Sequence, residues 1–177
     1  MSDVEKLKYP IGAFHRVATP LSMIARRELI EEIEHAPVPL ASIAKHLTES
    51  QLETPYRPGG WTVRQVLHHV PDSHLNAYVR FKKAVTEDAP PIAGYEEARW
   101  AELADTKLPV QVSMDLLTAL HQRWVVFLRS LPADAFARTY VHPQMGAVTL
   151  DQALAIYAWH GKHHLAHVEL ALGKRTV

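Results

Sequence analysis

Residues 149–173 read TLDQALAIYAWHGKHHLAHVELALG, and this stretch decides the fold class. We predict that it forms one helix, which begins near Thr149 and ends at Gly173, because glycine is favoured just beyond a helix C-terminus. His160 and His164 stand four residues apart, so their side chains project from the same face of that helix. The stretch therefore supplies one long helix and a pair of imidazoles that share a direction.

Three more long helices are predicted upstream of this stretch. Apolar residues recur at intervals of three and four over residues 21–35, 62–86 and 113–131, which is the spacing of an amphipathic helix. Ser113 fits the N-cap of the last of these, and Pro71 predicts a local kink in the one before it. Four long helices with almost no alternating strand pattern predict an all-α four-helix bundle.

The segments between the long helices carry the residues of turns and loops. They predict an irregular N-terminal lead-in and long connecting loops. The expected features are an extended lead-in over residues 1–20, a helix interrupted by Pro37 and Pro39 that resumes through Leu47, a capping box at Thr48 and Gln51, a loop with one turn around 96–103, and a loop over 140–148.

Length and composition exclude several classes of protein. A chain of 177 residues corresponds to about one domain, so we expect a single domain over 1–177. The 19 basic and 19 acidic residues cancel, which argues against a nucleic-acid-binding protein. No apolar stretch approaches the roughly 20 residues of a membrane span. Residues 1–10 are charged and lack the apolar region of a signal peptide, so we expect a cytoplasmic protein. The chain has no cysteine and 12 histidines.

The histidines are the candidates for chemistry. Two imidazoles four residues apart on a helix can chelate one metal ion. The alternative is a solvated pair, or a pair hydrogen-bonded to carboxylates across the bundle. A zinc peptidase would carry glutamate after the first histidine, and here that position is Gly161. A third ligand must therefore come from another helix, and periodicity leaves His68, His69 and His74 open for that role.

The chain resembles the DinB/YfiT superfamily of metal-binding four-helix proteins, and most closely its YfiT branch. The resemblance rests on the run GGWTVRQVLHHV with the following DSH, on YPIG near the N-terminus, on QLETPYR, on the segment around Trp124, and on WHGKHH in the last helix. It covers nearly the whole chain. That branch includes bacillithiol S-transferases and proteins labelled metal-dependent hydrolases.

The resemblance implies a specific site. In this family the histidine eight residues after the tryptophan of the W-[ST] motif joins the H-x-x-x-H pair of the last helix. Counted from Trp61, that rule implies His69, His160 and His164 as ligands of one divalent ion, zinc or nickel, in a homodimer. Pro71 departs from the family pattern two residues after the implied ligand, so the geometry around His69 is where we expect a difference.

Three functions are compatible with such a site. A metal-bound hydroxide would hydrolyse a small-molecule substrate, whereas a metal-held thiolate would undergo S-transfer from a small thiol to an electrophile. We favour S-transfer because the chain places no glutamate beside the histidine pair and because the resemblance points that way. A structural or sensing metal site is the third function, with His163 or His167 as a fourth ligand.

Other polar residues are weaker candidates. Asp72 and Asn76 could orient a ligand imidazole, although surface positions explain them better. Arg64 and Arg123 could neutralise an anionic substrate or could simply be solvated. Tyr56-Arg57 lies in the loop before Trp61 and could line the mouth of a pocket.

Overall fold

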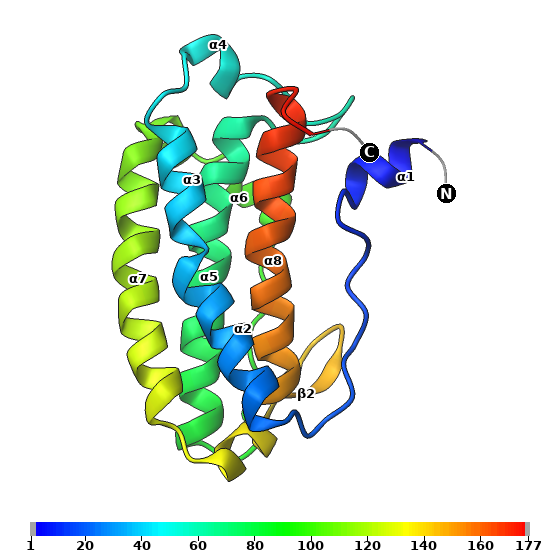
Figure 1. Ribbon diagram of the computed structural model, residues 1–177, viewed down its shortest axis with the longest axis vertical. Coiled ribbons are helices and arrows are strands. Elements are labelled where there is room, and N and C mark those ends of the chain that lie inside the picture. Colours follow the sequence, from blue (N-terminus) through cyan, green and yellow to red (C-terminus); the bar gives the residue numbers. More distant parts are fainter. Residues whose placement is uncertain (1–2, 176–177) are drawn as a thin grey trace.

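The computed structural model describes residues 3–175, which form a bundle of four helical columns (Figure 1). One column combines α2 and α3, which follow each other through Ala36, and it packs against α7 and α8. Helix α5 packs against the same two helices from the other side. The bounds of the column helices are α2 (Met23–His35), α3 (Pro37–Ala44), α5 (Val63–Thr86), α7 (Val110–Ser130) and α8 (Leu150–Ala171). This arrangement confirms the predicted all-α four-helix bundle.

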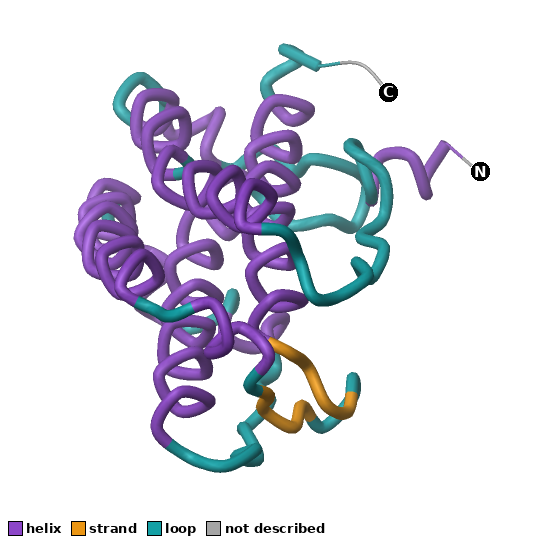
Figure 2. Tube along the Cα trace, turned by 60° about the horizontal axis from the view of Figure 1, so that its bottom comes forward, coloured by secondary structure: helices purple, strands orange, loops and turns teal. Residues whose placement is uncertain are grey.

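Short elements connect the columns. A hairpin lies beside the N-terminal end of α8, and both described chain ends lie near the opposite end of that helix (Figures 1 and 2). The short elements are α1 (Asp3–Lys8), α4 (Glu49–Leu52), α6 (Glu97–Trp100), the 3₁₀ helices η1 (Ala104–Lys107) and η2 (Ala133–Ala137), β1 (Thr139–His142) and β2 (Gly146–Thr149).

Three helices begin with the same local device. At the start of α4, α5 and α8 a threonine hydroxyl accepts from the backbone N–H three residues on, and a glutamine side chain bonds back to the threonine N–H. This capping box satisfies two of the backbone donors that a helix start leaves free. The box predicted at Thr48 and Gln51 is confirmed, and Thr62 and Thr149 form the other two.

The segment predicted as a loop over 140–148 is instead an antiparallel hairpin, so that prediction is wrong. Tyr140 pairs with Val148, and both side chains are buried. Gly146 has a φ of +71°, a value that glycine adopts without strain. Strands of four residues are too short for the two-residue alternation to be seen in the sequence.

Two further expectations need correction. Helix α7 begins at Val110 with Pro109 as its N-cap, not at Ser113, because Val110 and Met114 extend the buried stripe by one turn. The N-terminal lead-in contains the short helix α1 before its extended part. Pro71 lies inside α5, as the sequence pattern predicts, and the helix continues through it.

The core has two apolar clusters, one toward each end of the bundle. Phe81, Trp124 and Leu154 belong to one cluster, and Leu67 and Leu117 belong to the other. Along α5, α7 and α8, histidines lie where one cluster gives way to the other. They are His69, His74, His121, His160, His163, His164 and His167, all largely or fully buried except the half-buried His160. No helix within residues 3–175 combines the length and apolarity that crossing a membrane requires.

Candidate metal centre

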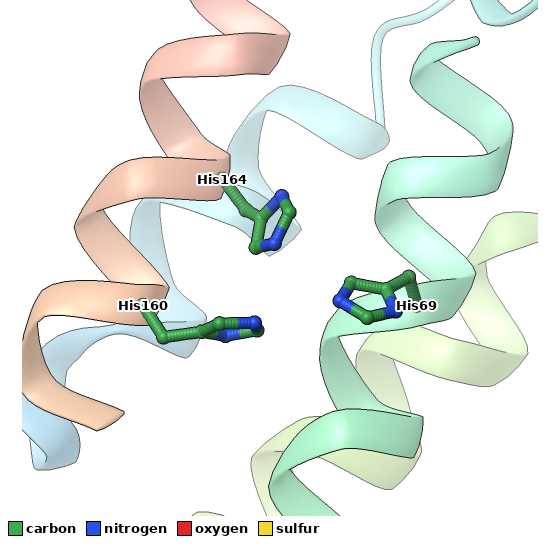
Figure 3. A group of neighbouring side chains, drawn as sticks. All are labelled: His69, His160 and His164. Carbon is green, nitrogen blue, oxygen red and sulfur yellow. The ribbon is translucent and has the colours of Figure 1, made fainter. Parts of the chain in front are cut away.

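Three histidines from two helices converge on one point. His160 and His164 project from successive turns of α8, and His69 projects toward them from α5 (Figure 3). One ring nitrogen of each lies within 4.8 Å of the other two. The structure thus brings together the three residues that the resemblance implied as ligands.

The adjacent histidine faces a different neighbour. The ring of His68 faces the start of α7. Its Nδ1 lies 2.7 Å from the Ser113 hydroxyl in that helix, and its Nε2 lies 3.2 Å from the carbonyl oxygen of Leu108, just before the helix. Consecutive residues of a helix point about 100° apart, so only one of the pair can face α8. The ring of His69 instead packs on Trp61, with 4.6 Å between ring centroids. Helical phase alone left this choice open, and packing decides it.

The third candidate on α5, His74, lies deeper than the triad. Its side chain is fully buried, and its nitrogens contact His121 at 2.7 Å and His160 at 3.0 Å. It is therefore neither an isolated core histidine nor a member of the group of three.

Burial makes the triad neutral near pH 7. Desolvation lowers the pKa of His69 to about 4 and lowers the pKa of His160 and His164 well below the ordinary value. Positive charge on the neighbouring histidines would lower each pKa further. A neutral imidazole keeps the lone pair that a metal ligand needs.

A cavity of about 420 Å³ opens over the three histidines. Its walls come from α5, α8, the segment around α6 and the hairpin, so residues far apart in sequence line the same cavity. Trp61, Tyr140 and Tyr157 supply aromatic surface, and Ser73 supplies a hydroxyl 3.4 Å from Nε2 of His160.

Sequence reasoning missed the polar residues of this cavity. Arg80 is buried, and its guanidinium donates to the Tyr157 hydroxyl at 3.0 Å and to the Ala93 carbonyl at 3.2 Å. Tyr95 and Glu97 line the cavity from the segment around α6. Helical periodicity in the sequence cannot identify cavity residues such as Tyr95 that come from connecting segments. The charge of Arg80 within an apolar helix face was the one signal available in the sequence.

Gly161 is closely packed, which disfavours a larger side chain such as glutamate at this position. A Cβ at this position would lie 3.1 Å from the Cβ of Ala36 and 3.8 Å from Cε1 of His74. The position faces the junction of α2 and α3, and a glutamate there would be forced against that junction.

The weaker candidates have structural partners. Arg64 forms ion pairs with Glu49 and Glu53, and the guanidinium of Arg123 lies 5.8 Å from the ring centroid of Tyr78. Asn76 donates to the Asp72 carbonyl at 2.9 Å. Burial and the charge of Asp105 raise the pKa of Asp72 to about 6.

Tyr56 and Arg57 do not line the cavity. Tyr56 stacks on His167 with 3.9 Å between ring centroids. Arg57 lies with its guanidinium carbon 5.4 Å from the Tyr56 ring centroid, and its Nη1 donates to the Pro58 carbonyl at 3.1 Å.

The donor set suits a divalent metal. Three neutral imidazoles that face a cavity could hold one divalent ion, and an ion with only three protein ligands would keep at least one position open. Their ring nitrogens, all within 4.8 Å of one another, lie close enough for the three residues to share one ion. Within residues 3–175 no other cluster of histidines and carboxylates forms such a group.

The sequence profile of the DinB superfamily matches residues 32–168, a span that includes all three histidines. The chain belongs to the DinB superfamily. A Bacillus mycoides relative is 52% identical over 93% of this chain and 95% of its own length, and it is named a putative metal-dependent hydrolase. A Bacillus cereus relative of the same name is 51% identical over 92% of this chain and 93% of its own.

Solved structures agree with this assignment. YfiT from Bacillus subtilis is 43% identical, superposes with a TM-score of 0.90 and covers 95% of this chain and 97% of its own. It is described as a probable metal-dependent hydrolase with an unusual four-helix bundle topology. The four-helix bundle protein TT2238, at 21% identity, a TM-score of 0.55 and coverage of 79% of this chain and 94% of its own, shares the fold. This DinB-superfamily chain thus has close relatives that bear the name of a metal-dependent enzyme.

Proposed function

We propose that this protein is an enzyme that uses one divalent ion held by His69, His160 and His164 to transfer a small thiol to an electrophilic substrate. The observation that carries the proposal is the triad itself, in which three neutral imidazoles face a cavity. The names of the DinB relatives support the dependence on metal. The transfer reaction, the ion (zinc or nickel) and a homodimeric state are parts of the proposal.

The bound metal would supply a Lewis acid that keeps a coordinated thiol deprotonated near neutral pH. The chain's own residues prepare the space around it. Trp61, Tyr140 and Tyr157 give the cavity an aromatic lining, and the Arg80 guanidinium adds a buried positive charge in the wall. In the overall reaction the sulfur–carbon bond forms, the bond from carbon to its leaving group breaks, and the thiol proton passes to solvent.

Hydrolysis is the second candidate, and one observation favours it. The exposed Glu97 lines the same cavity, so a carboxylate that could act as a general base is present there. The names of the relatives, which describe metal-dependent hydrolases, also favour hydrolysis.

One experiment separates the two reactions. The zinc- or nickel-loaded protein is incubated with monochlorobimane and a panel of low-molecular-weight thiols, and in parallel with ester and amide substrates. We expect thiol conjugation that is lost in His160→Ala and His164→Ala and kept in the neighbouring control His68→Ala. Hydrolysis that depends on these two histidines, with no thiol conjugation above background, would contradict the transfer reaction and support hydrolysis instead.

A cobalt-substituted protein tests whether the site is open. We expect its visible spectrum to change when a thiol or azide is added, because a free coordination position accepts an exogenous ligand. A spectrum that responds to neither ligand would instead support the structural or sensing role. Sedimentation of the purified protein measures the oligomeric state and checks the expected homodimer.

A further inference from the structure

A chain of hydrogen bonds leads from His160 to a backbone carbonyl on α2. Nδ1 of His121 lies 2.5 Å from the carbonyl oxygen of Ile33. A carbonyl oxygen only accepts hydrogen bonds, so Nδ1 of His121 carries the proton and donates it. In a neutral imidazole the other nitrogen, Nε2, is then an acceptor.

The next two links follow by the same reasoning. Nδ1 of His74 lies 2.7 Å from Nε2 of His121 and must donate to it. The two ring planes differ by 14°, which is compatible with an N–H···N bond that lies in the plane of both rings. Nε2 of His74 is then the acceptor for Nδ1 of His160, 3.0 Å away. His160 is left with its lone pair on Nε2.

A second, shorter chain leads from His164 to the N-terminal segment. Nε2 of His167 lies 3.1 Å from the carbonyl oxygen of Lys8, at the end of α1, and donates to it. Nδ1 of His167 is therefore an acceptor, and Nδ1 of His164, 3.3 Å away, donates to it. His164 is also left with its lone pair on Nε2.

We infer that His74, His121 and His167 are positioning residues that hold His160 and His164 in the Nδ1–H tautomer, so that Nε2 of each is the metal-binding atom. This inference rests on the metal site proposed above. It assigns a role to three buried histidines outside the triad. In this role His167 hydrogen-bonds to a metal ligand instead of binding the metal as a fourth ligand.

Burial supports the neutral state that the chains require, since desolvation lowers the pKa of both His121 and His167 to about 4. Metal-ligating histidines commonly donate their second N–H to a carboxylate or a carbonyl. Here each chain ends on a carbonyl, which carries no net charge. Unlike a carboxylate, these carbonyl groups do not offset the positive charge of a bound cation. The site therefore favours an anionic ligand in the open coordination position.

Long-range ¹H–¹⁵N spectra of ¹⁵N-histidine-labelled protein read the tautomers directly. In the metal-free wild type at pH 7.5 we expect protonated Nδ1 and unprotonated Nε2 for His74, His121, His160 and His164, and the opposite pattern for His167. After zinc is added, the Nε2 signals of His160 and His164 should shift while their Nδ1–H groups persist. An Nε2–H tautomer for either residue would overturn the inference. The metal-free spectrum reports on the chains even if the protein proves not to be an enzyme.

Matched variants test the function of the chains. His74→Leu and His167→Leu remove a link, whereas His74→Gln and His167→Gln retain one donor and one acceptor in a side-chain amide. By competition with a chromophoric chelator, we expect the leucine variants to bind zinc about 10–100-fold more weakly and the glutamine variants to recover most of that loss. Leucine variants that fold, as judged by circular dichroism, and bind zinc like the wild type would contradict the positioning role. If the leucine variants do not fold, the glutamine variants and the wild-type spectra decide.

Discussion

At the scale of single residues, two adjacent histidines on α5 have different partners. His68 faces α7 and is satisfied by Ser113 and Leu108, whereas His69 faces α8 and the cavity. We therefore expect His69→Ala to lose stoichiometric zinc, because it removes one of three ligands from a site that needs them all. His68→Ala should keep about one ion per chain.

Metal analysis of the two purified variants checks this prediction. Both substitutions remove an imidazole from the same turn of α5. Each variant therefore controls for the effect of losing an imidazole from that turn. The opposite result, with zinc lost in His68→Ala and kept in His69→Ala, would show that the assignment of the third ligand is wrong.

At the scale of helices, a buried ion pair joins the start of α2 to the start of α8. Nε of Arg26 lies 2.7 Å from Oδ1 of Asp151, and Nη2 lies 2.9 Å from Oδ2. The Leu21 N–H also donates to Oδ2 at 2.9 Å. We expect Asp151→Ala to lower the free energy of unfolding by about 3–5 kcal/mol, since it leaves the buried Arg26 without a counter-charge.

Urea denaturation of the metal-free protein measures this loss. Replacing both partners, with Arg26→Met and Asp151→Leu together, should recover much of the stability, because an apolar pair leaves no unpaired charge in the interior. Lys83→Ala, which removes an exposed pair with Glu87 at 3.5 Å, is the control and should cost less than about 1 kcal/mol. If Asp151→Ala costs no more than this control, the buried pair does not stabilise the bundle.

At the scale of the whole molecule, the buried histidines make stability depend on pH. Burial lowers the pKa of His69 and His121 to about 4, against about 6.5 in an unfolded chain. Between about pH 6.5 and 4 the unfolded chain binds protons at these positions and the folded chain does not. The free energy of unfolding should therefore fall with falling pH, by up to about 1.4 kcal/mol per pH unit for each histidine.

Asp72 has the opposite effect on stability. Its pKa is raised to about 6 in the folded chain, so as the pH falls the folded chain binds a proton at this carboxyl before the unfolded chain does. The histidines outnumber it, so the net slope keeps their sign. Urea denaturation of the chelator-treated protein at pH 7 and pH 5 tests the prediction, and His121→Gln should have a smaller pH dependence. Equal stability at the two pH values would refute it.

Local physics made much of this protein predictable from its sequence. The periodic apolar residues of 62–86 and the capping threonines lie within one or two turns of the groups they affect, so local sequence predicts the bounds of these helices to within a few residues. The spacing of His160 and His164 was likewise enough to place both imidazoles on one face of α8. His69 came from a resemblance, since helical phase describes a face of α5 but not the neighbour that the face meets.

Only the tertiary structure decided what surrounds these side chains. The cavity combines α5 and α8 with a hairpin whose strands are too short to show a pattern, and with Tyr95 and Glu97 from a connecting segment. The hydrogen-bond chains join His121 to a carbonyl 88 residues away and His167 to one 159 residues away. Hydrogen bonds act over about 3 Å, and the folded path of the chain alone determines which distant groups come that close.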